Sequence, residues 1–478
     1  MALRTAADFL AGLRDAREVY YRGERVPSVV DHPELGVAAR HAAIDYEMAE
    51  NPKYRELTVH REGSDEYSAY YRVPRNSQDL LSRSKLIEAG TAEGATLVLL
   101  IKEIGTDALF ALKRVLGRSG DAQGIQRVEA FYRGCRDKDL AMAVAQTDVK
   151  GDRSRRPCEQ SDPDMYVRVV EKRADGIVVS GAKIHTSCTP YVDEVIVLPS
   201  RSMGPGDEPW SLAFAVPVAT PGLRLYASDY LHGTDDPFTR PISTNHKMVE
   251  TLTVFENVFV PWERVFFVDR PDLAGATALT FVEFHRFTAV SYKLPLLDTL
   301  VGAGIAIAKA NGIDRAGHVR DKLTWLGGYA ETVRGLTELA ALRCKVEDGV
   351  AYPDVFTINL AKWTFAREFH RAIETVQDLA GGLLVTGPGS RDWDSPTVRP
   401  VLEKYLPAAW PAEGRMAIMN LISDMTTRLY GGYQAVLAVH AEGSIEAEKM
   451  AMFRAYDPSR SIALAMRLAG IEATAAAK

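Results

Sequence analysis

Two polar blocks carry the residue types best suited to chemistry. The first, AQTDVKGDRSRRP, runs from Ala145 to Pro157, and the second, GAKIHTSCTPYVDE, begins at Gly181. Hydroxyl, amide and backbone groups held rigidly in this way can hydrogen-bond to the nitrogen and oxygen edge of a flavin ring. A Ser- and Thr-rich turn in a β-domain would also explain the composition. The candidate flavin contacts are Thr147, Thr186, Ser187 and Thr189, with Asp148 beside the first.

A third block, FHRFTAVSYK, places polar side chains on an otherwise apolar helix from Phe284 to Lys293. His285 and Tyr292 are seven residues apart, so two helical turns bring them to one face. Imidazole and phenol groups suit proton transfer, and the neighbouring Arg286 suits an anionic substrate. A lone histidine on a helix is more often a packed core or surface residue.

A fourth block, DLAGGLLVTGPGSRD, contains Gly381 and Gly382. Paired glycines allow a second backbone or a pyrophosphate to approach closely. The alternative is an ordinary glycine terminus of a helix.

The elements that position these blocks fall into three regions. Apolar residues recur three and four apart up to about residue 139, short β-rich runs separated by Gly and Pro follow, and long amphipathic stretches return beyond residue 274. We therefore predict an α+β fold with an N-terminal helical domain, a central β-domain and a C-terminal four-helix bundle. The predicted units are 1–140, 141–272 and 273–478. The predicted bundle helices are Phe281–Asn311, Ala316–Val346, Val355–Ala380 and Glu413–His440.

Composition narrows the function classes. The chain has 46% hydrophobic and 25% charged residues and a net charge of −6, so it has no electrostatic footprint for nucleic acid or anionic lipid. No continuous apolar run approaches the length of a membrane span, and the N-terminus lacks the pattern of a secretory signal. The four cysteines form no CxxC or CxxxC pair, so we expect no metal site. A cytoplasmic protein is expected.

In order and spacing, these blocks resemble the family that joins the oxygenase components of 4-hydroxyphenylacetate 3-monooxygenase to 4-hydroxybutyryl-CoA dehydratase. The resemblance covers nearly the whole chain, from VDHPELGVAARHAAIDYEMAENPKY to AEGSIEAEKM, and looks closer to the dehydratase branch. It implies an acyl-CoA dehydrogenase-like fold, bound FAD, and a homotetramer in which one subunit's C-terminal region completes a neighbour's flavin site. The positions that match the family's flavin contacts are Thr147, Asp148, Ser187, Gly381 and Gly382.

The dehydratase branch carries an iron–sulfur cluster on three cysteines and one histidine, and that ligand set is incomplete here. Its CxxxC pair falls on Leu99 and Glu103, its third cysteine falls on Tyr292, and only His285 is retained. Thiolates are the ligands that iron–sulfur clusters require. We therefore expect neither the cluster nor a dehydratase of that mechanism.

The hydroxylase branch differs in its substrate pocket. The Arg and Tyr that hold its phenol acid fall near Ile104 and Ala108, and its phenol-contacting His falls near Val144. We therefore expect the substrate pocket of this chain to differ from that of the hydroxylase branch. The polar side chains available to line it are Glu103, His185, His285, Arg286, Tyr292 and Lys293.

Three functions remain open from the sequence. The first is a two-component monooxygenase, in which a separate flavin reductase supplies reduced FAD and a small aromatic or related substrate is hydroxylated. His285 would be its base, Arg286 its anion anchor and Tyr292 a proton donor. The second is an iron-free FAD-dependent dehydrogenase, isomerase or eliminase acting on an acyl-CoA-type substrate. The third is a scaffold that has lost catalysis.

Overall fold

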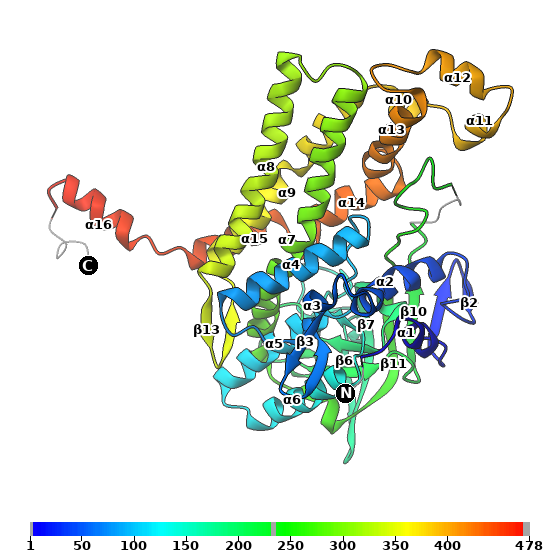
Figure 1. The fold of residues 1–478 in the computed structure, drawn as a ribbon. Helices are drawn as coiled ribbons and strands as arrows, with labels where there is room; N and C mark the ends of the chain where they lie inside the picture. Colours follow the sequence, from blue (N-terminus) through cyan, green and yellow to red (C-terminus); the bar gives the residue numbers. More distant parts are fainter. Residues whose placement is uncertain (1–2, 231–235, 472–478) are drawn as a thin grey trace.

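Helices form most of the N-terminal region of the computed structural model, which describes residues 3–230 and 236–471 (Figure 1). Polar caps begin several of them: Thr5 and Asp8 form a capping box, and Asn76 and Asp121 accept from backbone N–H groups of the first turn. The helices are α1 (Ala6–Gly12), α2 (Leu35–Glu50), α3 (Arg55–Thr58), α4 (Ser77–Glu93), α5 (Glu103–Ser119) and α6 (Ala122–Asp137).

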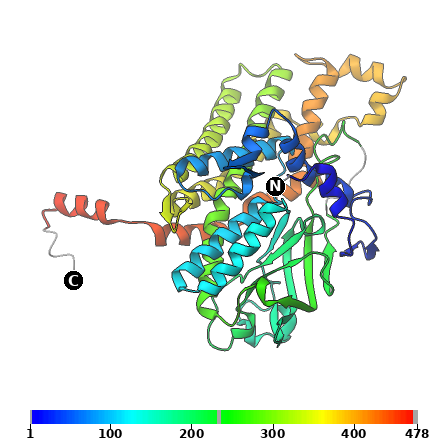
Figure 2. The same ribbon diagram turned by 60° about the horizontal axis from the view of Figure 1, so that its bottom comes forward.

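Two sheets make up the central β-domain, which lies beside α5 and α6 in Figure 2. The six-stranded sheet has the order β2-β1-β10-β11-β7-β6, and the four-stranded sheet has the order β12-β9-β8-β5. Their strands are β1 (Glu18–Tyr21), β2 (Glu24–Val26), β5 (Met142–Ala145), β6 (Arg168–Lys172), β7 (Gly176–Ser187), β8 (Glu194–Val197), β9 (Ala213–Pro217), β10 (Leu223–Ala227), β11 (Glu250–Pro261) and β12 (Val265–Phe267).

The N-terminal region also contributes to the larger sheet, which the helical prediction did not include. Strand β1 pairs in parallel with β10, with Val19 opposite Leu225. Strands this short show too little alternation to be recognised locally. Helices give way to strands between α6 and β5, and strands to helices between β12 and the next helix. The division into 1–140, 141–272 and 273–478 stays a proposal, because one sheet joins the first two.

The C-terminal region is a bundle of long helices with short helices at its far end and an extended C-terminal arm (Figure 1). Its long helices are α7 (Pro271–Ala310), α8 (Gly317–Leu342), α9 (Val355–Ala380), α13 (Ala412–Thr426) and α14 (Leu429–His440). The shorter helices are α10 (Leu383–Thr386), α11 (Ser390–Asp394), α12 (Arg399–Tyr405), α15 (Ile445–Ala455) and α16 (Ser459–Leu468).

The helix predicted from Glu413 to His440 is broken in the structure. Helix α13 ends at Thr426 and α14 begins at Leu429, with Arg428 in an extended conformation between them. A side chain on Gly431 would lie 2.6 Å from the Thr426 backbone nitrogen, so the two helices meet closely at this corner. Periodicity does not reveal such a break, because both helices keep apolar residues on their inner faces.

Helix α7 is the central element of the bundle and packs against α4, α5, α8 and α9. Its length and apolar composition would suffice to cross a membrane, but most of its apolar stretch is buried inside the protein, as in the core helix of a soluble protein. The middle of the helix, from residue 284 to 297, is buried on all sides, which explains why its sequence there is largely apolar.

Small hairpins and single 3₁₀ turns complete the fold. The hairpins are β3 (Val59–Glu62) with β4 (Asp65–Ser68), and β13 (Lys345–Glu347) with β14 (Val350–Tyr352). The 3₁₀ turns are η1 (Ala69–Tyr71), η2 (Pro157–Glu159), η3 (Pro163–Met165), η4 (Thr189–Tyr191), η5 (Glu208–Trp210) and η6 (Trp262–Arg264).

Candidate functional site

A carboxyl group lies at the interface between the β-domain and the helical bundle, here called the seam. Glu250 opens β11 and stands opposite Ser187, the last residue of β7. The Ser187 hydroxyl donates to Glu250 Oε2 at 2.8 Å, and the Tyr433 hydroxyl on α14 donates to Glu250 Oε1 at 3.0 Å. Two strand ends of one domain and a helix of the other therefore converge on one carboxyl group.

Burial raises the pKa of Glu250 to about 7, although the hydrogen bonds from Ser187 and Tyr433 favour its ionised form. A carboxyl group poised near neutral pH can accept or release a proton during turnover. No sequence pattern singles out Glu250. The only local signal is an acidic residue at the head of an apolar strand, which is common at strand ends.

The raised pKa of Glu250 predicts a pH-dependent loss of stability. The folded protein holds this proton more tightly than the unfolded chain, so stability falls as the pH rises from about 4.5 through about 7. The full loss is about 3 kcal/mol. Urea unfolding at pH 5 and pH 8 should show a smaller difference for Glu250→Gln than for the wild type. The control is Glu256→Gln, an exposed carboxyl on the same strand; equal differences in all three proteins would contradict the prediction.

Thr186 precedes Ser187 at the same strand end, and its hydroxyl is unusual. Thr186 is 1% exposed, and its Oγ1 finds no hydrogen-bond partner within the described parts of the chain. A buried hydroxyl without a partner is costly, and bound ligands often supply the missing bond. The orphan hydroxyl beside Ser187 therefore fits the polar edge of a flavin, as the sequence predicts for both residues.

The Thr147–Asp148 turn lies against the same strand, but Asp148 has another role. The Thr147 carbonyl accepts from the Ile184 N–H at 3.0 Å. Asp148 Oδ1 accepts from Lys183 Nζ at 2.6 Å, and its other oxygen accepts from the Ser200 hydroxyl. The Asp148 side chain thus fixes the turn to β7, and its proposed contact with the flavin remains a prediction.

His285, Asp107 and Arg83 form a buried chain of polar contacts across three helices, here called the relay. The Nδ1 of His285 lies 2.9 Å from Asp107 Oδ2 on α5, and Arg83 on α4 donates to Asp107 Oδ1 at 2.7 Å. The His285 ring stacks on Phe281 with 5.2 Å between centroids. The carboxylate fixes the ring orientation and leaves Nε2 as the nitrogen for chemistry. The sequence pointed to His285 but could not identify Asp107.

Tyr292 and Lys293 converge on Glu442 in the turn between α14 and α15. The Tyr292 hydroxyl donates to Glu442, and Lys293 Nζ lies 2.9 Å from Glu442 Oε2. Burial opposes ionisation of Glu442, but the ammonium groups of Lys293 and Lys362 outweigh it and lower its pKa to about 2. Burial lowers the pKa of Lys293 to about 8 despite the neighbouring Glu442. This ionic cluster joins α7, α9 and the turn before α15.

Arg286 points away from the relay. Its guanidinium donates to Asn359 Oδ1 at 2.6 Å and to the Glu442 carbonyl at 3.1 Å, and the residue is buried. These contacts occupy the side chain with packing of the bundle. A role as an anchor for an anionic substrate remains a prediction that would require these bonds to be exchanged.

Glu103 holds the start of α5. Its carboxyl oxygens accept from the N–H groups of Leu100 and Lys102 at 3.0 and 3.2 Å, and burial raises its pKa. Leu100 has φ +57°, so this turn is held in an uncommon backbone conformation. The carboxyl group caps the strained turn, and a contact with substrate is a prediction.

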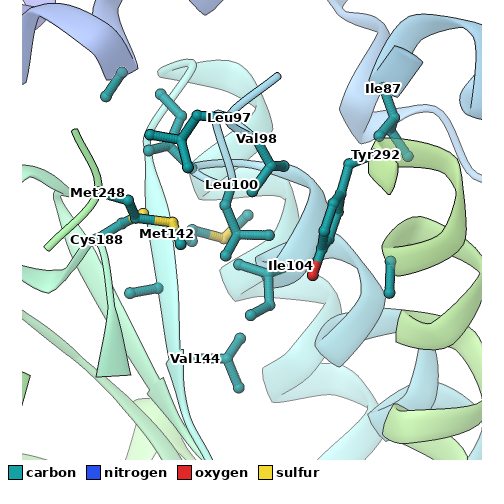
Figure 3. Packing of buried hydrophobic residues seen from close by; sticks show 14 of the residues in the cluster. Ile87, Leu97, Val98, Leu100, Ile104, Met142, Val144, Cys188, Met248 and Tyr292 are labelled. Carbon is teal, nitrogen blue, oxygen red and sulfur yellow. The ribbon is translucent and has the colours of Figure 1, made fainter. Parts of the chain in front are cut away.

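Apolar side chains line the region between the two domains. In Figure 3, Leu100 and Ile104 lie between Met142 of β5 and the Tyr292 ring, with Val144 below. All of these residues are at most 9% exposed. These buried apolar side chains, here called the apolar wall, occupy the positions where the resemblance places the phenol-acid contacts of hydroxylases.

Two groups of predicted residues do not join this seam within one chain. His185 has φ +57° and lies on the exposed side of β7. Gly381 and Gly382 are exposed after α9, at the end of the bundle remote from β7 (Figure 1). A side chain at either glycine would meet nothing within 4 Å. Any contact of this glycine pair with a flavin would have to be made in another subunit.

Metal ligands do not gather around this seam. Across residues 3–230 and 236–471, no group of three or more His, Cys, Asp or Glu side chains is arranged to hold a metal ion. The expected lack of an iron–sulfur cluster therefore stays a prediction for chemical analysis.

Known proteins match the chain along almost its whole length. The family description "4-hydroxyphenylacetate 3-hydroxylase N terminal" matches residues 5–267, and "4-hydroxyphenylacetate 3-hydroxylase C terminal" matches residues 274–470. The 4-hydroxyphenylacetate 3-monooxygenase oxygenase component of Thermus thermophilus is 31% identical over 90% of this chain and 90% of the relative. The 4-hydroxybutyryl-CoA dehydratase/vinylacetyl-CoA-Delta-isomerase of Clostridium aminobutyricum is 27% identical over 98% of this chain and all of the relative. Identity is higher to the first and coverage is higher to the second.

Solved structures agree with the fold. The oxygenase component of 4-hydroxyphenylacetate 3-monooxygenase complexed with FAD and 4-hydroxyphenylacetate has 28% identity and a TM-score of 0.91, over 98% of this chain and 99% of that chain. Glutaryl-coenzyme A dehydrogenase, with 13% identity and a TM-score of 0.50 over 91% of this chain and 87% of that chain, shares the fold alone. The predicted acyl-CoA dehydrogenase-like fold is confirmed, and the chain belongs to the 4-hydroxyphenylacetate 3-hydroxylase family.

Proposed function

We propose that the chain is the oxygenase component of a two-component, FAD-dependent monooxygenase that hydroxylates a small aromatic or related substrate. The observation that carries the proposal is the polar seam of Thr186, Ser187 and Glu250. It combines an unpartnered buried hydroxyl with a carboxyl group of pKa about 7. The similarity to an oxygenase complexed with FAD and 4-hydroxyphenylacetate supports this assignment.

Bound FAD would supply the redox chemistry that activates oxygen. The chain's own residues have three tasks. The Thr186 hydroxyl can donate a hydrogen bond to the ring edge, and the Ser187 hydroxyl, which donates its one proton to Glu250, can accept one. Glu250, with a pKa of about 7, can hold or accept a proton near neutral pH, and His285 Nε2 is available for proton transfer with substrate. The apolar wall around Ile104 excludes water, which strengthens the polar interactions inside the site.

The apolar wall also indicates the kind of substrate. Ile104, Ala108 and Val144 are buried and carry no group that could bind a carboxylate. We therefore propose a phenolic or related ring whose remote substituent is apolar or uncharged. An acidic side chain on the substrate would lose its hydration there without a cationic partner.

The proposed partners are a separate flavin reductase and three further copies of this chain. The C-terminal arm, formed by helix α16, projects from the body in Figure 1, and it exposes large apolar side chains, with Ile462 49% and Leu468 77% exposed. Exposed apolar surface of this kind is typical of subunit interfaces. A homotetramer would cover the arm and bring Gly381 and Gly382 to a neighbour's flavin.

Removal of the arm tests this proposal. Sedimentation of the chain truncated after Tyr456 should show a smaller assembly than the untruncated chain.

A cytoplasmic location is proposed for the assembly. All four cysteines are free, and Cys135 and Cys188 are buried thiols. Unpaired thiols are typical of proteins in reducing compartments.

Oxygen consumption tests the proposed function. With photoreduced FAD and a panel of substituted phenols, the purified chain should consume oxygen and form hydroxylated product, and oxidised FAD alone should support neither. Anaerobic turnover of an acyl-CoA ester without oxygen would instead establish the dehydrogenase or isomerase alternative. Metal analysis of anaerobically purified protein should find no stoichiometric iron or sulfide, and four of each per subunit would overturn the expectation of an iron-free site.

A further inference from the structure

Arg83 on α4 is the member of the relay farthest from the imidazole ring, and its guanidinium is buried and fully engaged. The residue is 5% exposed. Its Nη2 donates to Asp107 Oδ1 at 2.7 Å, to the Thr106 hydroxyl at 2.8 Å and to the Glu103 carbonyl at 2.9 Å. Its Nη1 donates to the Tyr70 carbonyl at 3.0 Å. Four hydrogen bonds in a rigid fork hold the cation in one orientation.

Helix packing fixes this cation relative to α7 as well. The Arg83 guanidinium lies 5.9 Å from the centre of the Phe110 ring on α5 and 5.8 Å from that of Phe284 on α7. The next residue along α4, Ser84, has its hydroxyl 2.8 Å from the Ser291 hydroxyl on α7. Because Phe284 directly precedes His285, the separation of cation and imidazole is set by three packed helices and not by a loop.

The contacts of Asp107 decide which nitrogen of His285 carries a proton. Asp107 is 0% exposed, its Oδ1 forms an ion pair with Arg83, and its Oδ2 lies 2.9 Å from His285 Nδ1. An arginine stays protonated in proteins, and a carboxylate can only accept hydrogen bonds. The contact with Asp107 therefore requires the proton on Nδ1. A neutral imidazole has one N–H, so the lone pair of Nε2 is free.

Removal of the Arg83 charge would reverse this arrangement. Burial without a cationic partner favours the neutral form of a carboxyl group. A neutral Asp107 would donate to His285 Nδ1, and the ring proton would then lie on Nε2. An imidazole held in the wrong tautomer cannot act as a base and loses most of its catalytic effect.

We propose that Arg83 is a positioning residue that fixes the tautomer of His285 through Asp107 and so makes Nε2 a proton acceptor. The proton comes from a phenolic hydroxyl of the substrate. The O–H bond breaks and an Nε2–H bond forms, which leaves a phenolate and an imidazolium, and no electrons are transferred. The inference rests on the proposed function for the identity of this proton donor.

A double-mutant cycle tests the inference. Arg83→Met and Asp107→Asn should each lower kcat by about a hundredfold with little change in KM or FAD affinity, because general base catalysis contributes on the order of 10² to 10⁴. The double variant Arg83→Met/Asp107→Asn should be no slower than Asp107→Asn alone, since Arg83 acts through Asp107. Losses that multiply in the double variant would overturn the inference, as would wild-type kcat in Arg83→Met.

Two further variants separate this role from a contribution to stability. Arg83→Met leaves a buried carboxylate unpaired, which is strongly destabilising. If it does not fold, the charge-balanced double variant is compared with Asp107→Asn, and a further loss of kcat of about tenfold or more would overturn the inference. The control is Arg114→Met on α5, whose buried guanidinium pairs with Glu347 at 2.6 Å and lies 4.2 Å from the Tyr352 ring. The control should lose stability and keep wild-type kcat.

A chromogenic phenol reports the tautomer without turnover. At pH 6 and without oxygen, 4-nitrophenol is titrated into the protein with oxidised FAD, and the absorbance of its phenolate gives the ionised fraction of the bound probe. That fraction should be larger in the wild type than in Arg83→Met. In a His285→Ala background, Arg83→Met should have no further effect. Equal fractions in the wild type and Arg83→Met, or a further effect in the His285→Ala background, would contradict the inference.

The two measurements distinguish failure of this inference from failure of the proposed function. If ionisation of the probe depends on Arg83 and His285 but reduced FAD and phenols support no oxygen consumption, the proposed function fails and the inference stands. If phenols are hydroxylated and Arg83→Met changes nothing, the inference fails and the proposed function stands. A wild-type protein that binds no phenol overturns both.

Discussion

Replacing His285 by alanine should lower turnover by about a hundredfold or more while changing FAD affinity little, because general acid–base catalysis contributes on the order of 10² to 10⁴ in rate. The structure supports His285 in this role through the Asp107 carboxylate at 2.9 Å, which fixes the orientation of the imidazole ring. Single-turnover kinetics with reduced FAD and substrate, together with a flavin titration, measure the two quantities.

The matched control for this experiment is His370→Ala, an exposed histidine on α9. Its turnover should equal that of the wild type. Asp107→Asn should shift the pH dependence of the rate in addition to lowering it, since Asp107 acts through His285. Wild-type turnover in His285→Ala would remove the residue from the mechanism.

The second large effect concerns stability. Glu442→Gln should lower the free energy of unfolding by about 3–5 kcal/mol, because it leaves Lys293 buried without its carboxylate partner, whereas Lys362 keeps Glu448 at 3.4 Å. Urea unfolding at pH 7 measures the loss. Glu446→Gln is the control, since its exposed pair with Lys449 contributes about 1 kcal/mol or less.

The lowered pKa of Glu442 also predicts how its contribution to stability changes with pH. The pKa of Glu442 is lowered to about 2, so its contribution is fully present above its unfolded pKa of about 4.5 and is lost as the pH falls through about 2. Glu442→Gln should therefore lose less stability than the wild type between pH 5 and pH 3. An unfolding free energy equal to that of Glu446→Gln at pH 7 would contradict the assignment of the cluster.

Local patterns predicted much of the fold. The helix predicted from Val355 to Ala380 is confirmed at both ends, and the short β-rich runs predicted in the central region include β8. Periodicity over three or four turns is strong enough to identify such elements. It failed at the Arg428 break, where a tight helix–helix contact rather than a polar interruption ends the helix.

Only some residues of the candidate site could be predicted from the sequence. Thr186, Ser187 and His285 could be selected because polar residues stand out against an apolar strand or helix. Glu250 and Asp107 could not be selected from the sequence. Acidic residues are common at the ends of helices and strands and among other charged residues. The importance of these two comes from partners 63 and 178 residues away in the chain.

By itself, the sequence determined where most of the long helices lie, which segments concentrate polar groups, and that the thiolates of an iron–sulfur cluster are missing from their expected positions. The tertiary structure decided which polar groups meet. It placed Ser187 and Tyr433 on Glu250, Asp107 on His285, and both lysines on Glu442. The physical reason is that backbone periodicity is a local property, whereas burial, and with it the pKa of a buried acid, depends on the packing of distant elements.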